Sequence, residues 1–187
     1  MNALVAALLL ALAAPAAAAE PATVTRQQQP DGNHLLVHET IVEAPRADVW
    51  RAVSTAEGWK EWAAPAAWSP AGRPDVIETS YKPGAKPGDP STIQQLVLLR
   101  LPERLMIFRT IKAPDGFPDF DTFAGVLSVL ELEALDERRT RVRLIGSPYP
   151  DTDAGRRLLG FFEKGNRSSL EQLRARFKAN EPPQVAP

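Results

Sequence analysis

Residues 40–50 read Thr-Ile-Val-Glu-Ala-Pro-Arg-Ala-Asp-Val-Trp, and the hydrophobic pattern changes at the proline. From Leu35 to Val42 the side chains alternate and several are β-branched, which predicts a strand. From Val49 to Val53 apolar residues recur at helical spacing, and Pro45 suits the first turn of a helix. The sequence therefore predicts a first strand that leads almost directly into a helix.

A second short helix and a series of strands follow. Trp59 and Trp62, three residues apart after Gly58, are consistent with one face of a short helix. Two polar turns, 102–104 and 136–139, separate runs that are typical of hairpin strands. The strands predicted after the helices cover residues 76–81, 92–101, 105–111, 123–135 and 140–145.

The last long segment, Asp151 to Lys178, has apolar residues at i, i+3 and i+4 spacing, which is typical of an amphipathic helix. Asp151, Thr152 or Asp153 would cap its start. Strands joined by hairpins form an antiparallel sheet with one face to cover, and this helix is long enough to lie across that face. We therefore expect an α+β domain with a ligand cavity between the curved sheet and the C-terminal helix.

The composition excludes several classes of protein. The 187 residues include no cysteine, and 22 basic side chains balance 23 acidic ones. A disulfide framework, a thiolate nucleophile and cysteine-ligated zinc are therefore excluded. The even balance of charge argues against nucleic-acid binding, which uses concentrated positive charge.

The ends of the chain differ from its middle. Residues 2–19 carry no charged side chain and end in four alanines before Glu20, the pattern of a secretory signal peptide. This run is alanine-rich and contains Pro15, so a stable membrane span is not expected. We expect cleavage near Ala19 and a periplasmic or secreted protein. Residues 20–33 are predicted as a flexible lead-in, 34–178 as one domain, and 179–187 as a disordered tail.

Five segments in this order resemble the START-like (SRPBCC, Bet v I-type helix-grip) superfamily. Residues 40–50 resemble its entry signature, and 58–62 are similar to its second helix with a tryptophan. Residues 102–105 and 132–142 resemble two of its hairpins, and 161–173 its closing helix. Within the superfamily, the chain is most similar to the polyketide cyclase/dehydrase group and to homologues of the activator of heat-shock protein 90 ATPase.

The resemblance implies the helix-grip fold. In this fold a curved antiparallel sheet wraps around a long C-terminal helix, two short helices follow the first strand, and a deep apolar cavity separates sheet and helix. Members include lipid carriers, cyclases, hydroxylase domains and co-chaperone domains, so the resemblance favours no single activity. Chaperone activation does not suit an exported protein. Asn166 stands where the group often has an aromatic residue, which would make the cavity more polar there.

No motif for a cofactor or a metal emerges from the sequence. A phosphate-cradling glycine loop and a Gly-x-Ser-x-Gly elbow are both absent. His34 and His38 are separated by about 13 Å on a strand, too far to share one metal ion. In residues 151–155 the glycine comes one position earlier than in a calcium-binding loop. These residues are therefore expected to cap the helix that follows. His38 points inward with Leu36 and is the weak catalytic candidate.

Aromatic and polar side chains are predicted to line the cavity, although core packing is the alternative for any one ring. These residues are Trp59, Trp62, Tyr81, Phe108, Phe117, Phe120, Phe123, Phe162, Asn166 and Ser169. We expect a protein that binds a small hydrophobic or amphipathic molecule without chemistry. A cyclase- or dehydratase-like enzyme ranks below it, and an envelope interaction protein with a vestigial cavity is the third reading.

Overall fold

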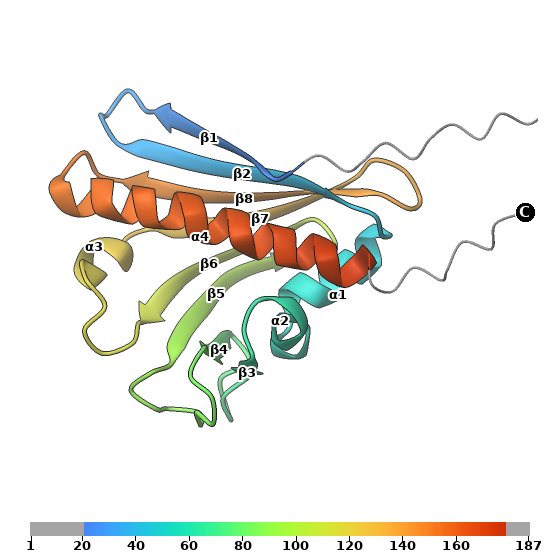
Figure 1. The fold of residues 1–187 in the computed structure, drawn as a ribbon, viewed down its shortest axis with the longest axis horizontal. Coiled ribbons are helices and arrows are strands. Elements are labelled where there is room, and N and C mark those ends of the chain that lie inside the picture. Colours follow the sequence, from blue (N-terminus) through green and yellow to red (C-terminus); the bar gives the residue numbers. More distant parts are fainter. Residues whose placement is uncertain (1–20, 179–187) are drawn as a thin grey trace, which may run out of the picture.

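The computed structural model describes residues 21–178, which form four helices and eight strands (Figure 1). In chain order the elements are β1 (Thr23–Gln28), β2 (His34–Val42), α1 (Arg46–Ser54), α2 (Ala56–Trp62), β3 (Ala66–Trp68), β4 (Val76–Ser80), β5 (Ile93–Leu101), β6 (Leu105–Lys112), α3 (Phe120–Phe123), β7 (Leu127–Ala134), β8 (Thr140–Tyr149) and α4 (Asp153–Lys178). The signal peptide and the C-terminal tail that the sequence predicts lie outside the described residues.

All eight strands join one sheet in the order β1-β2-β8-β7-β6-β5-β4-β3, and every pairing is antiparallel. The sheet curves, and α4 runs across its concave face (Figure 1). Helices α1 and α2 follow β2 and lie beside the C-terminal end of α4. The structure confirms the predicted α+β class, with a curved antiparallel sheet around a long C-terminal helix.

The stretch around Pro45 forms the predicted strand–helix junction. Strand β2 ends at Val42, and the amides of Asp48 and Val49 donate to the Pro45 carbonyl at 3.0 and 3.1 Å to open α1. Helix α2 then packs directly against α1. A Cβ atom on Gly58 would lie 2.4 Å from the Ala52 carbonyl oxygen, so this close approach requires glycine.

The long helix α4 begins where the sequence predicts. The side chain of Thr152 accepts a hydrogen bond at 3.1 Å from the amide of Gly155, which satisfies one of the free donors at the helix start. A Cβ atom on Gly155 would lie 1.9 Å from the Pro150 carbonyl oxygen, so glycine allows the tight entry into the helix. Capping is therefore the role of this segment, as expected.

Strand β1 is a difference from the sequence-based expectation, which places residues 20–33 in a flexible lead-in. Residues Thr23–Gln28 pair with β2 along their whole length, from Thr23 opposite Glu39 to Gln28 opposite His34. The strand lies at the edge of the sheet, and five of its six residues are exposed. Because an edge strand of this kind buries little on either face, its sequence carries no alternating pattern.

Two further boundaries differ. Phe123 was expected in a strand, but the amides of Phe123 and Ala124 bond back to Asp119 and Phe120, which forms the short helix α3. The last strand was expected to end at Ile145. Strand β8 instead continues to Tyr149, opposite His34, across a register irregularity in which a proline is tolerated.

The hydrophobic core of residues 21–178 falls into two clusters. The larger cluster lies between α1, α2, the C-terminal half of α4 and the middle of the sheet. The smaller cluster consists of Leu36, Val126, Tyr149, Leu158 and Leu159, with several half-buried aromatic rings against it. Within the described part of the chain, no helix has both the length and the apolar character needed to cross a membrane.

Candidate functional site

The face of α4 that meets the sheet is buried at both ends and open in the middle. Leu158 and Leu159 are buried near its start, and Leu170 and Leu173 near its end. None of the residues 160–169 is buried, although Phe162, Asn166 and Ser169 continue the same helical face. The opening along this face coincides with the gap between the two core clusters.

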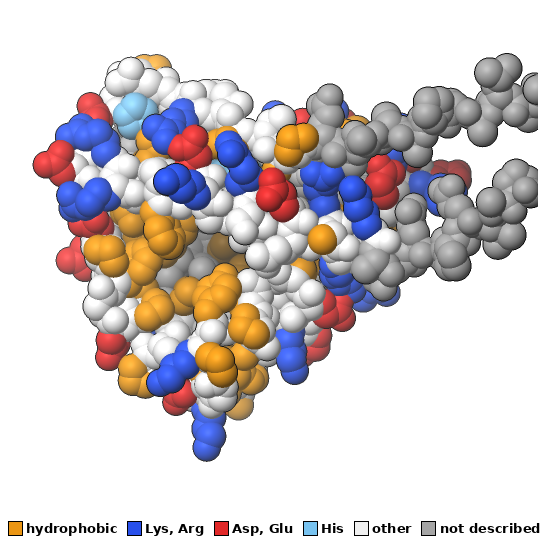
Figure 2. All heavy atoms as spheres, in the orientation of Figure 1, with side chains coloured by type: hydrophobic (Ala, Val, Ile, Leu, Met, Phe, Trp, Pro, Cys, Tyr) orange, Lys and Arg blue, Asp and Glu red, His pale blue; other side chains and the backbone are white. Residues whose placement is uncertain are grey.

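The concave face of the sheet is open at the same place. Leu144 on β8 is only half-buried, whereas its register neighbours His38 and Leu130 are completely or almost completely buried. Figure 2 shows a hollow below α4, over the region of α3 and β6, with hydrophobic side chains gathered around it. We refer to this hollow between α4 and the concave face of the sheet as the cleft.

One wall of the cleft consists of three aromatic side chains. The Trp59 ring packs edge-on against Trp62 and Phe108, with centroids 6.2 and 5.7 Å apart. The indole nitrogens of the two tryptophans donate to the carbonyls of Val53 and Ala52, at 2.6 and 2.9 Å. Both indole nitrogens are therefore satisfied by α1. Trp59 and Phe108 are buried in the larger core cluster, whereas Trp62 is half-buried.

The opposite wall is a second aromatic cluster on α3, the loop before it, the end of β8 and the first half of α4. The Phe123 ring lies 4.6 Å from Phe162 and 5.5 Å from Phe117, centroid to centroid. Phe161 and Tyr149 lie 5.1 and 6.4 Å from Phe162. These five rings form one connected set, in which Phe117, Phe123 and Phe162 are half-buried and Phe161 is 58% exposed.

An ion pair holds the second wall together. Asp119, directly before α3, accepts hydrogen bonds from Arg157 of α4 at 2.7 and 2.9 Å. These hydrogen bonds lower the pKa of Asp119, so the pair is present across the neutral range. The loop that carries Phe117 and the helix α3 that carries Phe123 are thereby fixed to the helix that carries Phe162.

Several polar groups near the cleft are neutral. The Tyr149 hydroxyl lies over Gly146, where a Cβ atom would be 2.6 Å from it, and it has no hydrogen bond within residues 21–178. Burial raises the pKa of Tyr149, so the hydroxyl stays protonated and is available to donate. Ser169 donates to the Gly165 carbonyl at 3.1 Å, and the Asn166 amide has no partner in the same described residues.

His38 lies inside the sheet–helix interface, as the alternation of β2 predicts. It has no exposed surface, and its Nε2 donates to the Glu163 carbonyl of α4 at 3.0 Å. Burial lowers its pKa from the ordinary 6.5, and the hydrogen bond to Glu163 only partly opposes this. The ring is therefore neutral, and its Nδ1 lone pair has no partner. Thr40, two residues along, also has an unpartnered hydroxyl.

The sequence-based site residues divide into three groups. Six of the ten lie in the two aromatic walls, namely Trp59, Trp62, Phe108, Phe117, Phe123 and Phe162. Asn166 and Ser169 lie on α4 between the walls. Tyr81 follows β4, is 62% exposed and joins neither wall, and Phe120 has no ring contact among the described residues. Phe123 reaches the cleft from α3 and not from the sheet.

Tyr149 and Phe161 belong to the second wall and were not predicted. Phe161 directly precedes Phe162 and lies one residue off the helical face that carries the predicted residues. Tyr149 lies beyond Pro148, where the strand was expected to have ended. The sequence signal that indicates Tyr149 is an aromatic residue shortly before the start of the long helix.

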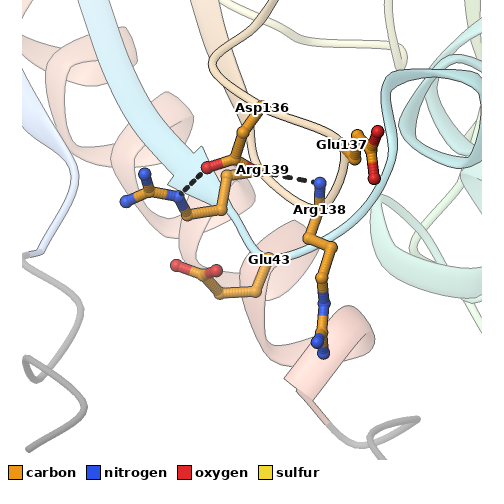
Figure 3. A pocket seen from close by; sticks show the side chains of 5 residues that line it. All are labelled: Glu43, Asp136, Glu137, Arg138 and Arg139. Atoms are coloured by element: carbon orange, nitrogen blue, oxygen red, sulfur yellow. Dashed lines mark hydrogen bonds and ion pairs between the residues drawn. The ribbon is translucent and has the colours of Figure 1, made fainter. Parts of the chain in front are cut away.

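Two surface pockets lie outside the cleft. The first, of about 480 Å³, is lined by Glu43 and by residues 136–139 of the β7–β8 turn, all exposed (Figure 3). In it Asp136 accepts hydrogen bonds from Arg139 Nε at 2.7 Å and from the Arg138 amide at 2.9 Å. The second, of about 490 Å³, lies beside the β5–β6 turn. Exposed charged side chains that pair with one another line the first pocket, so the cleft is the better candidate for an apolar ligand.

Comparison with known proteins finds similarity in structure but not in sequence. No family model matches the chain, and no curated protein matches it. The Aha1 dimer from Colwellia psychrerythraea matches with a TM-score of 0.59 at 16% identity, over 79% of this chain and 98% of that one. CalU16 from Micromonospora echinospora matches with a TM-score of 0.56 at 16% identity, over 90% and 89%.

The di-domain ARO/CYC protein BexL, from the BE-7585A biosynthetic pathway, matches with a TM-score of 0.60 at 17% identity. The match covers 79% of this chain and 48% of that one. The chain has the helix-grip fold of START-like proteins. At these identities the likeness is one of fold, and the helix-grip architecture explains why the cleft lies between α4 and the concave sheet. No three His, Asp or Glu side chains of residues 21–178 converge to hold a metal ion.

Proposed function

We propose that this helix-grip protein binds a small hydrophobic or amphipathic molecule in the cleft. The observation that supports this most directly is the half-buried middle of α4, where Phe162, Asn166 and Ser169 continue a face that is buried at both ends. A helix that only completed a core would bury this stripe throughout. An occupant of the cleft would cover the exposed ring and sheet surface.

The chemistry of the cleft favours an occupant that is uncharged where it lies against the sheet. Ring faces supply both walls, and apolar burial contributes about 25 cal/mol per Å² to affinity. The free polar groups are the Tyr149 hydroxyl and the Asn166 amide, both neutral. One or two hydroxyl or carbonyl groups on the ligand would satisfy them and fix its orientation.

Catalysis in the same cleft is the second candidate, because the neutral His38 ring keeps a free Nδ1 lone pair that is able to accept a proton. The ring has no exposed surface, so a substrate would have to displace neighbouring groups to reach it. Binding therefore ranks first. Export to the periplasm or beyond is also our proposal, on the charge-free alanine-rich run of residues 2–19.

The test compares two aromatic positions with a neutral apolar probe, N-phenyl-1-naphthylamine, whose fluorescence increases in apolar surroundings. Phe162→Asp places a carboxylate in the second wall and should weaken probe binding at least about tenfold, because burial of an unpaired charge is unfavourable. Tyr81→Asp is the matched control, since Tyr81 is exposed and outside both walls. Circular dichroism checks that each variant is folded.

The same samples can be examined without a probe. Native mass spectrometry of the protein recovered from a producing cell should show a retained small molecule in the wild type and none in Phe162→Asp. A folded Phe162→Asp variant that binds the probe as well as the wild type does would show that the cleft is not the binding site.

A further inference from the structure

The convex face of the sheet carries a continuous row of aliphatic side chains. The row crosses five strands as direct register partners, from β2 through β8, β7 and β6 to β5. Its members are Val37, Ile145, Val129, Ile107 and Leu99. Because successive strand residues alternate between faces, these side chains point away from α4, whereas His38, Leu130 and Met106 point toward it.

This face stays uncovered within the described chain. The row itself is half-buried, apart from Leu99, which is 40% exposed. Ile41, Leu101 and Leu127, on the same face by alternation, are 37%, 46% and 40% exposed. Four of the seven large hydrophobic residues that are exposed in residues 21–178 therefore lie on one sheet face. Exposed apolar side chains that gather on one face in this way favour an interaction surface.

Charged side chains border the apolar row, and their sign alternates from strand to strand. Arg143 and Arg141 on β8 lie opposite Glu131 and Glu133 on β7 in the register. Arg143 Nε also approaches Glu39 of β2 at 3.0 Å. Arg141 and Arg143 also pair with Glu133 and Glu131, at 2.6 and 3.6 Å, on this outer face of the sheet.

We propose that two copies of the chain pack through their convex faces, about a two-fold axis that runs along the strands between β7 and β8. With this axis, β8 of one subunit lies over β7 of the other. The aliphatic row of one subunit then lies over the same row of its partner. Ile145 then meets the partner's Val129, and Val37 meets the partner's Ile107. Arg143 meets the partner's Glu131, and the converse pair forms by symmetry.

The pattern of charge is what favours a second copy over an unrelated partner. Basic residues on β8 and acidic residues on β7 are equidistant from the proposed axis, so the face is complementary to itself. Two twisted sheets that pack with their strands aligned also follow a common geometry for face-to-face contact. This dimer leaves α4 and the cleft on the outer side of each subunit.

The test uses two charge reversals, Arg143→Glu and Glu131→Arg, in the full chain. Each variant alone places like charges across the two-fold twice, so sedimentation equilibrium should show self-association weakened about tenfold. In an equimolar mixture, Glu at 143 in one subunit meets Arg at 131 in the other, and both cross-subunit pairs are restored. The mixture should therefore form a heterodimer with wild-type affinity, identified by its mass.

Mixing does not restore the Arg143–Glu131 pair within either variant subunit. Association that is restored on mixing therefore arises from pairs between subunits. Lys164→Glu, an exposed charge on α4, is the control and should dimerise as the wild type does. Circular dichroism verifies folding. A monomeric wild type, or single variants that weaken association without rescue on mixing, would overturn the proposed interface.

Discussion

The two hydrophobic clusters, which form the larger and the smaller half of the core, differ in the residues that build them, although α4 contributes to both. The larger half contains eighteen buried hydrophobic residues, mostly aliphatic, from helices and strands that lie far apart in the sequence. The smaller half contains five, and half-exposed rings from α3 and its loop complete it. The larger half therefore holds the fold together, whereas the smaller half leaves ring surface exposed.

The largest effect that tests this difference comes from the same deletion made in each half. Leu173→Ala, at a fully buried position of the larger half, should lower the unfolding free energy by about 3–5 kcal/mol. Leu158→Ala, 2% exposed in the smaller half, should lower it by about 2–3 kcal/mol, because the rings around it can shift into the space.

Urea denaturation measures both values. The m-value should stay the same in the two variants, so that the midpoints report stability alone. Equal losses, or a larger loss for Leu158→Ala, would mean that the smaller half is packed as rigidly as the larger one.

The fold was predictable because its elements carry strong local patterns. The junction at Pro45, the hairpin turns and the period of α4 each follow from the residues themselves. Strand β1 was not predictable, because an exposed edge strand gains its order from pairing with β2 and not from its own sequence. The short helix α3 was missed because four residues are too few to establish a period.

The site was predictable in composition more than in arrangement. Helical spacing places Phe162, Asn166 and Ser169 on one face, which the structure confirms. That this face lacks a core partner in its middle depends on the curvature of the sheet, which no local pattern encodes. Tyr149 was missed for a similar reason, since its place depends on β8 continuing past Pro148.

A smaller effect on stability is expected from pH, through His38 at the boundary of the two halves. Its pKa is lowered in the folded protein, whereas in the unfolded chain it returns to about 6.5. Below that pH the unfolded chain binds a proton that the folded protein does not, so the unfolding free energy should fall as pH decreases from 7 to 5.

Urea denaturation at pH 5, 6 and 7 checks this window, and His38→Gln should remove most of the dependence. Glu163, whose side chain pairs with Arg26, has a pKa below its ordinary 4.5 and does not titrate in this range. A wild type whose stability does not change between pH 7 and 5 would contradict the burial of a neutral His38.

The smallest effect is a gain in stability at the middle of α4, between the two halves. Gly165 is exposed, and a Cβ atom there would meet no other atom within 4 Å. Gly165→Ala should therefore raise the unfolding free energy by about 0.5–1 kcal/mol, because alanine loses less backbone freedom in a helix. Gly58→Ala is the opposite control and should be destabilising, since its Cβ atom would strike the Ala52 carbonyl. Urea denaturation measures the unfolding free energy of both variants.

A loss of stability in Gly165→Ala would mean that the middle of α4 departs from a regular helix. The open face between the two core clusters would then need another explanation.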